Sequence, residues 1–378
     1  MILVPGSMPN IIRSGFNEKS TFVKIFMKYF TNIHKNKTYN IIIRMMIVFV
    51  TYYYIYKEIF QKKRGDEEVQ ISWQTLVDYF SEIGHEPHTK FFITWILLLM
   101  IVNWGIESLK WQYLIGKVEK VPFLKSFEAV LSGVSVSIFT PNRVGEWFGR
   151  VFILKKVNPW KGVFITMIGS FSQLLTTFVV GSISFLFYFP IYFRDSEFYS
   201  QYLYYGIILV VLGINAALLL IFLNISVLPA FANKILKKRF IKAKEYFSVI
   251  SDYSTGELIT VFIFSFLRYC VFSLQFYLFL MLFSIEIPLF HGLMIISLVY
   301  FIMTAIPTVT LTELGIRGAV SVYFISQYFI TFGEYSETIK FGIFASSFAL
   351  WIVNLALPAL IGTIFVFRLK FFRRRKNG

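Results

Sequence analysis

Charged residues are scarce in this chain of 378 residues. They make up only 15% of it, well below the roughly 25% of ordinary soluble domains, whereas hydrophobic residues make up 56%. A single soluble core stops growing at roughly 250–300 residues, so a soluble fold of this length could not bury so much apolar surface. The composition therefore argues against a soluble enzyme and a disordered chain, and it indicates an all-α polytopic membrane protein.

Cysteine and the familiar nucleotide and hydrolase motifs are also lacking. The single cysteine, Cys270, cannot form an internal disulfide, and its place inside an apolar run indicates a small core residue. The sequence contains no P-loop, no G-x-G-x-x-G after a strand and no G-x-S-x-G, so we expect neither ATP-driven transport within this chain nor a cofactor. The tetrad from His85 to His88 lacks the H-E-x-x-H spacing, and we expect no metal site there.

The strongest charge bias is a net charge of +16. The basic residues fall in clusters between apolar runs, so they are interpreted as topology signals and contacts to anionic lipid rather than as a nucleic-acid surface. The protein is predicted to lie in the bacterial inner membrane with both termini in the cytoplasm. The stretches predicted to be cytoplasmic are 1–38, 224–257 and 369–378. The other connections are acidic or nearly neutral and are predicted to face outward: 61–90, 191–199 and 333–340.

The ends of the chain are predicted to flank one transmembrane domain at 39–368. The segment 1–38 carries apolar residues at helical spacing opposed by lysines, which fits a basic amphipathic helix on the membrane surface; a disordered basic tail is the alternative. Residues 369–378 form a basic tail.

About six apolar runs are long enough to span a bilayer: 40–60, 91–115, 162–190, 201–223, 258–284 and 341–367. Two further apolar regions, 122–160 and 287–332, are each interrupted by a polar motif that contains glycine. With the loops placed as above, the first must enter from the cytoplasm and return to it, and the second must do the same from outside. Each is a full or a re-entrant helical hairpin, and the opposed pair resembles an inverted repeat with broken helices near the midplane.

Each interruption combines helix breakers with charges. The first reads TPNRVGEWFGR from Thr140 to Arg150, and the second reads PTVTLTELGIRG from Pro307 to Gly318. Proline and glycine are predicted to break the helices at five positions: Pro141, Gly145, Pro307, Gly315 and Gly318. Because a charge near the midplane costs about 2.5–3.5 kcal/mol, the charged residues at the two matched breaks need an explanation.

Three interpretations of these charges are open. The arginines and the helix N-termini after each break would bind an anionic headgroup, with Arg143 and Arg317 forming one site. Alternatively, Arg143–Glu146 and Glu313–Arg317 are internal ion pairs, or both motifs lie at the membrane surface. The candidate substrate-binding residues are Thr140, Asn142, Arg143, Glu146, Arg150, Arg268, Glu313 and Arg317.

Two other polar positions lie inside apolar runs. Glu107 and Lys110 are spaced to pair, with Asn103 and two tryptophans beside them, or else they snorkel at the interface beside a tryptophan belt. Arg268 lies about ten residues into its span, close to the middle of the bilayer. It is a functional candidate by default, or a buried partner for Glu313 or Glu146.

The two interrupted stretches resemble the signature stretches of the lysylphosphatidylglycerol synthase transmembrane-region family, also called flippase-like. They read SVSIFTPNRVGEWFGRVFILKK and IPTVTLTELGIRGAVSVYF, and the resemblance covers roughly 40–368. The family's first motif is similar to T-P-x-R-x-G-E, which is matched here by Thr140, Pro141, Arg143, Gly145 and Glu146. In the second motif Gly315 and Arg317 match, but Gly318 stands where many members carry Glu, so an acid role is not carried over to that position.

The resemblance implies lipid translocation. The best-known members fuse this region to a soluble domain that makes aminoacylated phosphatidylglycerol, and here the chain ends at Gly378 directly after the last predicted span. We therefore expect any lipid aminoacylation to require a separate synthase or glycosyltransferase partner, and we expect membrane lipids, with an anionic headgroup, as the ligands.

Three functions stay open at this point. The first is a lipid or lipid-linked-sugar flippase. The second is a membrane-embedded transferase acting on a lipid headgroup, with Glu146 or Glu313 as general base. The third is a non-catalytic subunit that binds lipid. The absence of a soluble synthase domain favours a protein that is not itself an enzyme.

Overall fold

The computed structural model describes residues 88–138, 140, 143–194, 197, 199–229, 246–306, 310–333 and 335–366. Within these ranges all regular structure is helical, and no strand occurs. The predicted span 40–60, the N-terminal segment and the basic tail lie outside the described residues.

The first half of the described chain contains four α-helices longer than two turns and one short one. They are α4 (Thr89–Ile115), α5 (Phe123–Ser137), α6 (Gly145–Val151), α7 (Pro159–Phe193) and α8 (Gln201–Leu223). The 3-10 turns η3 (Ile225–Val227) and η5 (Ser248–Asp252) follow.

The second half begins with α11 (Thr255–Leu282). The helices that follow it are α12 (Leu289–Ala305), α13 (Thr310–Phe332), α14 (Glu337–Trp351) and α15 (Leu357–Val366). A single π-helical turn, Ile352–Ala356, joins α14 to α15 without a loop.

Side-chain caps fix several helix starts. Asn158 accepts a hydrogen bond from the Trp160 N–H, and Pro159 occupies the first turn of α7, where its missing N–H costs nothing. Ser254 and Glu257 form a reciprocal capping box at the start of α11. These local signals explain why the helices begin where the sequence changes from polar to apolar.

Five helical segments are long and apolar enough to cross a membrane. They are Thr89–Ile115, Pro159–Phe193, Gln201–Leu223, Thr255–Leu282 and Glu337–Val366. Each coincides with a predicted apolar run, so the prediction of a polytopic helical membrane protein is confirmed. Cys270 corrects the expectation of a core residue: it is exposed on α11, on the same helix as the exposed apolar residues Phe266 and Leu267.

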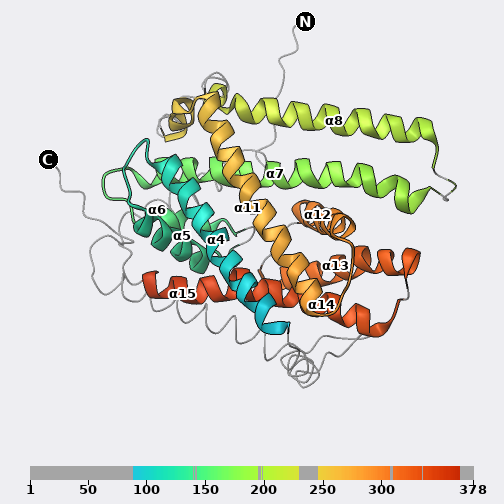
Figure 1. Cartoon of the computed structure of the whole chain (residues 1–378). Helices are drawn as coiled ribbons and strands as arrows, with labels where there is room; N and C mark the ends of the chain where they lie inside the picture. The colour runs from blue at the N-terminus through green and yellow to red at the C-terminus, as the bar shows by residue number, and fades with distance from the viewer. Residues whose placement is uncertain are drawn as a thin grey trace, which may run out of the picture.

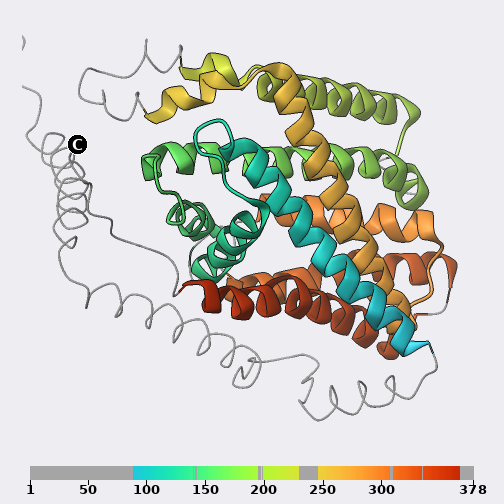
Figure 2. The same ribbon diagram turned by 60° about the vertical axis from the view of Figure 1, so that its left-hand side comes forward.

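The helices pack in a reciprocal pattern (Figures 1 and 2). In both views α4 and α11 run side by side diagonally across the bundle, and they are in extensive contact. The first helix of each interrupted region packs on a helix of the other half: α5 lies against α15, and α12 lies against α7. The two interrupted regions also meet directly, because Arg143 of the first contacts Glu313 of the second.

The interruptions themselves differ from the prediction. Gly145 is the first residue of α6, as a break requires, but Gly315 and Gly318 lie inside the continuous helix α13. The second break falls between Ala305 and Thr310, where Ile306 is extended, as expected for a residue that precedes a proline. Gly318 instead serves packing, because a Cβ there would lie 2.6 Å from the Phe344 ring of α14.

Candidate functional site

The turn before α6 is strained at its arginine. Arg143 has a φ of 56°, in the left-handed region that non-glycine residues rarely occupy. The turn is held by Thr140, whose hydroxyl oxygen accepts a hydrogen bond from the Gly145 N–H at 2.9 Å and whose carbonyl accepts one from the Arg143 N–H at 3.2 Å. Such strain persists only where the surroundings over-determine it, and it is concentrated at functional sites.

Arg143 reaches out of its own turn to the second interrupted region. Its Nη2 lies 3.0 Å from both carboxylate oxygens of Glu313, in the first turn of α13. The same carboxylate pairs with Arg317, one turn further along α13. One acid from α13 therefore holds two guanidinium groups that come from different interrupted regions. We call Arg143, Glu313 and Arg317 the two-arginine site.

The two-arginine site is open on one side. The Glu313 and Arg317 side chains are 8% and 11% exposed, whereas that of Arg143 is 36% exposed. The Nε of Arg317 is buried and has no hydrogen-bond partner in the described structure. The site has two arginines and one acid, so it carries one positive charge in excess. The Arg317 Nε–H is a donor without an acceptor in the described structure.

A second group of charges surrounds Glu107 of α4. Its carboxylate pairs with Lys110 at 2.8 Å, with Arg150 of α6 at 2.7 Å and with Arg268 of α11 at 3.2 Å. Arg150 also pairs with Glu146 in its own helix. We call these five residues the Glu107 cluster; Glu107, Lys110 and Arg150 are each no more than 5% exposed.

Neutral polar side chains complete the Glu107 cluster. Asn103 accepts a hydrogen bond from the Arg268 Nε at 3.1 Å and donates one to Asn354 at 3.1 Å. Asn354 lies in the π-helical turn, a feature that is frequent at functional sites. Gln173 of α7 accepts hydrogen bonds from Lys110 and Arg268, at 3.5 and 3.4 Å. Four helices and the π-helical turn thus converge on one buried carboxylate.

The observed pairing corrects several expectations from the sequence. The internal pair Glu313–Arg317 is present, but Arg143 pairs with Glu313 and not with Glu146, because the left-handed turn directs it across to α13. Arg268 has Glu107 as its partner, and neither Glu313 nor Glu146.

The interfacial interpretation of Glu107 and Lys110 is wrong. Lys110 is 1% exposed, and the neighbouring Trp104 and Trp111 are 4% and 1% exposed, so they form no belt at the membrane surface. Lys110 stays inside because it has Glu107 as counter-ion and hydrogen bonds to Gly169 and Ser265.

The structure brings the predicted site residues together in two groups. Arg143, Glu313 and Arg317 meet, with Thr140 supporting the turn, while Glu146, Arg150 and Arg268 belong to the Glu107 cluster. No hydrogen bond or ion pair in the described structure joins the two groups. Asn142, Pro141 and Pro307 lie outside the described residues.

Asn354 was not identified from the sequence. Its only signal there is a single amide in the apolar run 341–367. Of the tetrad from His85 to His88 the structure describes His88 alone, which is exposed. Within the described residues no group of three or more His, Cys, Asp or Glu side chains is placed to hold a metal ion.

Comparison with known proteins agrees with this architecture. The family model described as "Lysylphosphatidylglycerol synthase TM region" matches residues 87–357, which include both interrupted regions and both charged groups. No curated protein and no solved structure matches the chain. Since the match extends over most of the chain, this integral membrane protein belongs to the family of the lysylphosphatidylglycerol synthase transmembrane region.

Proposed function

We propose that the protein translocates a lipid with an anionic, phosphate-containing headgroup, and that the two-arginine site binds this headgroup. One observation carries the proposal: Arg143 and Arg317 come from different interrupted regions and converge on a single acceptor, the carboxylate of Glu313. Membership of a family of membrane proteins of this flippase-like kind supports the same conclusion.

A phosphate group suits the chemistry of this site. Guanidinium groups bind phosphate oxygens in the same forked geometry in which they bind a carboxylate, so a lipid phosphate can take the place that Glu313 holds. The exposed side of Arg143 admits the headgroup, and the free Nε of Arg317 supplies a further donor. In this scheme Glu313 keeps the two arginines in place between transport cycles.

The two interrupted regions are the proposed path of the lipid headgroup across the membrane. We propose that the region at 122–160 opens to the cytoplasm and that the region at 287–332 opens to the outside, with both termini cytoplasmic, as the lysine and arginine bias predicts. The two-arginine site would then be reached from one leaflet at a time, through whichever interrupted region is open.

The ion pairs favour transport over transferase chemistry. A general base needs a carboxylate that is free to accept a proton, but Glu313 is held by two arginines and Glu146 by Arg150. Neither acid is available in the described structure without loss of an ion pair.

Reconstitution of the purified protein into liposomes tests the proposal. Fluorescent phosphatidylglycerol and phosphatidylcholine are placed in both leaflets, and the fraction that becomes accessible to an external quencher is followed over time. Arg143→Lys and Arg317→Lys should each slow movement of phosphatidylglycerol at least about tenfold, because a lysine offers no bidentate fork. The matched control is Arg194→Lys, a change at an exposed arginine at the end of α7. Full-speed transport in both variants, or no movement of phosphatidylglycerol by the wild type, would contradict the proposal.

A charge exchange separates binding from mere clamping. Arg143→Glu combined with Glu313→Arg keeps opposite charges facing each other across the two regions, although it removes the Glu313–Arg317 pair within α13. If the pair only clamps the fold, this double variant should transport at the wild-type rate. If the arginines bind the headgroup, it should recover thermal stability but not transport.

A further inference from the structure

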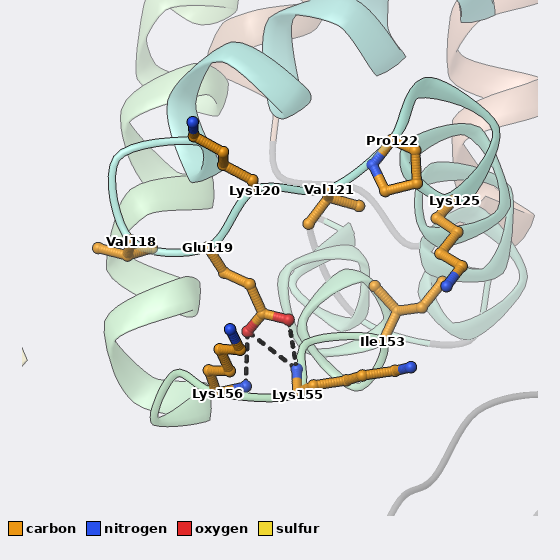
Figure 3. Close-up of a pocket in the computed structure, with 9 residues that line it drawn as sticks. All are labelled: Val118, Glu119, Lys120, Val121, Pro122, Lys125, Ile153, Lys155 and Lys156. Carbon is orange, nitrogen blue, oxygen red and sulfur yellow. Dashed lines mark hydrogen bonds between the residues drawn. The ribbon is translucent and has the colours of Figure 1, made fainter.

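A cleft of about 400 Å³ lies between two loops at one end of the bundle (Figure 3). One loop joins α4 to α5 and the other joins α6 to α7. Glu119 extends from the first loop, and its carboxylate accepts hydrogen bonds from the backbone N–H groups of Lys155 and Lys156 at 2.6–2.9 Å and of Val157 at 3.3 Å. The Glu119 carboxylate therefore holds the two loops together, and its oxygens are engaged by backbone N–H groups.

Lysines line the cleft from both loops and from the first turn of α5. They are Lys120, Lys125, Lys155 and Lys156, and all four are exposed. The ammonium groups of Lys120, Lys125 and Lys156 make no hydrogen bond or ion pair with any residue that the structure describes. Lys120, Lys125 and Lys156 make the cleft positive, and its volume falls in the range of small-ligand sites.

Apolar side chains beside the cleft point to a membrane ligand. Phe123 and Leu124, which lie between the lining residues Pro122 and Lys125, are 38% and 73% exposed. A free phosphate compound in water would gain nothing from these neighbours. A lipid satisfies both features, because its phosphate meets the lysines while its acyl chains cover the exposed apolar residues.

We propose that this basic cleft is a second lipid site, which binds the phosphate of an anionic phospholipid in the adjacent leaflet. It is separate from the two-arginine site, and it goes beyond the proposed transport because the lipid here is held at the surface and is not moved. Lysine is a point charge and not a planar fork, so the site selects for negative charge more than for headgroup shape.

The test measures lipid retention by the whole protein. Wild type and variants are purified in detergent, supplied with equal amounts of phosphatidylglycerol and phosphatidylcholine, and analysed by native mass spectrometry. The triple change Lys120→Gln, Lys125→Gln and Lys156→Gln should weaken retention of phosphatidylglycerol at least tenfold, since each lysine near an anionic surface contributes roughly fivefold. The control, Lys90→Gln with Arg194→Gln and Lys340→Gln, removes the same charge at helix ends away from the cleft and should leave retention unchanged.

The outcomes are distinct. Equal retention of phosphatidylglycerol by the triple variant and the wild type would overturn the proposal. So would displacement by millimolar inorganic phosphate, which would identify a soluble anion as the ligand. Because the two-arginine site also retains phosphatidylglycerol under the proposed function, the series is repeated in an Arg143→Lys background, where the loss caused by the lysine changes should persist.

Discussion

The Glu107 cluster and the two-arginine site carry the same excess charge, but they differ in access. Three bases face two acids in the cluster, and two bases face one acid in the site, so each has one positive charge in excess. In the cluster Glu107, Lys110 and Arg150 are buried, and Glu146 and Arg268 are 19% and 21% exposed, whereas in the site Arg143 is more than one-third exposed. The same chemistry is mostly buried in one region and open in the other, and under the proposed function only the open region binds a ligand.

The largest effect is expected from Glu107→Gln. The change leaves Lys110, Arg150 and Arg268 in a buried place without their shared counter-ion, so the free energy of unfolding should fall by about 3–5 kcal/mol. Denaturant titration of the protein in mixed micelles measures this. Glu337→Gln, at a glutamate that is 76% exposed, is the control and should change stability little. A stable Glu107→Gln protein would show that the cluster is not the closed structural unit described here.

Glu313→Gln should change lipid binding more than stability. Removing the charge frees both arginines for a ligand, so retention of phosphatidylglycerol should rise about fivefold, in line with about 1 kcal/mol for one charge near an anionic lipid surface. Transport should slow because the lipid is released less readily. Stability should fall by only about 1–3 kcal/mol, since Arg143 still reaches solvent. Native mass spectrometry and the liposome assay check the two halves of this prediction, and weaker lipid retention would contradict it.

Gly149→Ala should disturb both the Glu107 cluster and the two-arginine site. A Cβ at Gly149 would lie 2.6 Å from the Gly133 backbone, so α6 must move away from α5. The movement shifts Arg150 and the turn that holds Arg143, at an expected cost of about 1–3 kcal/mol together with slower transport. Gly213→Ala on α8 is the matched control, because a Cβ there meets nothing within 4 Å. Equal thermal stability of the two variants would show that this contact does not set the distance between the helices.

The smallest effect concerns the amide pair of the cluster. A double-mutant cycle with Asn103→Leu and Asn354→Leu should give a coupling energy of about 0.6 kcal/mol, the average for a hydrogen bond between membrane helices. Transport should be unchanged in Asn354→Leu, because Asn354 touches the closed cluster and not the two-arginine site. Loss of transport without loss of stability would contradict this prediction and would show that the π-helical turn takes part in transport.

Sequence alone determined the class of the protein and the places of its helices. The apolar runs at 91–115, 162–190, 201–223, 258–284 and 341–367 are all helical. In a bilayer a continuous apolar segment has no other way to satisfy its backbone, which is why this prediction depends on local sequence only. The same local logic identified the arginines and glutamates of the two interruptions as the unusual charges.

Only the tertiary structure decided which charges meet. Spacing along a helix shows which residues are able to pair within it, so Glu313–Arg317 was predictable while Arg143–Glu313 was not. The second pair depends on a left-handed turn at Arg143 and on two regions that are far apart in sequence lying against each other. Likewise, Glu107 collects its cations from α4, α6 and α11, and no local pattern encodes that convergence. A charge in a membrane takes the partner that packing brings within reach, because leaving it unpaired costs more than any local preference gains.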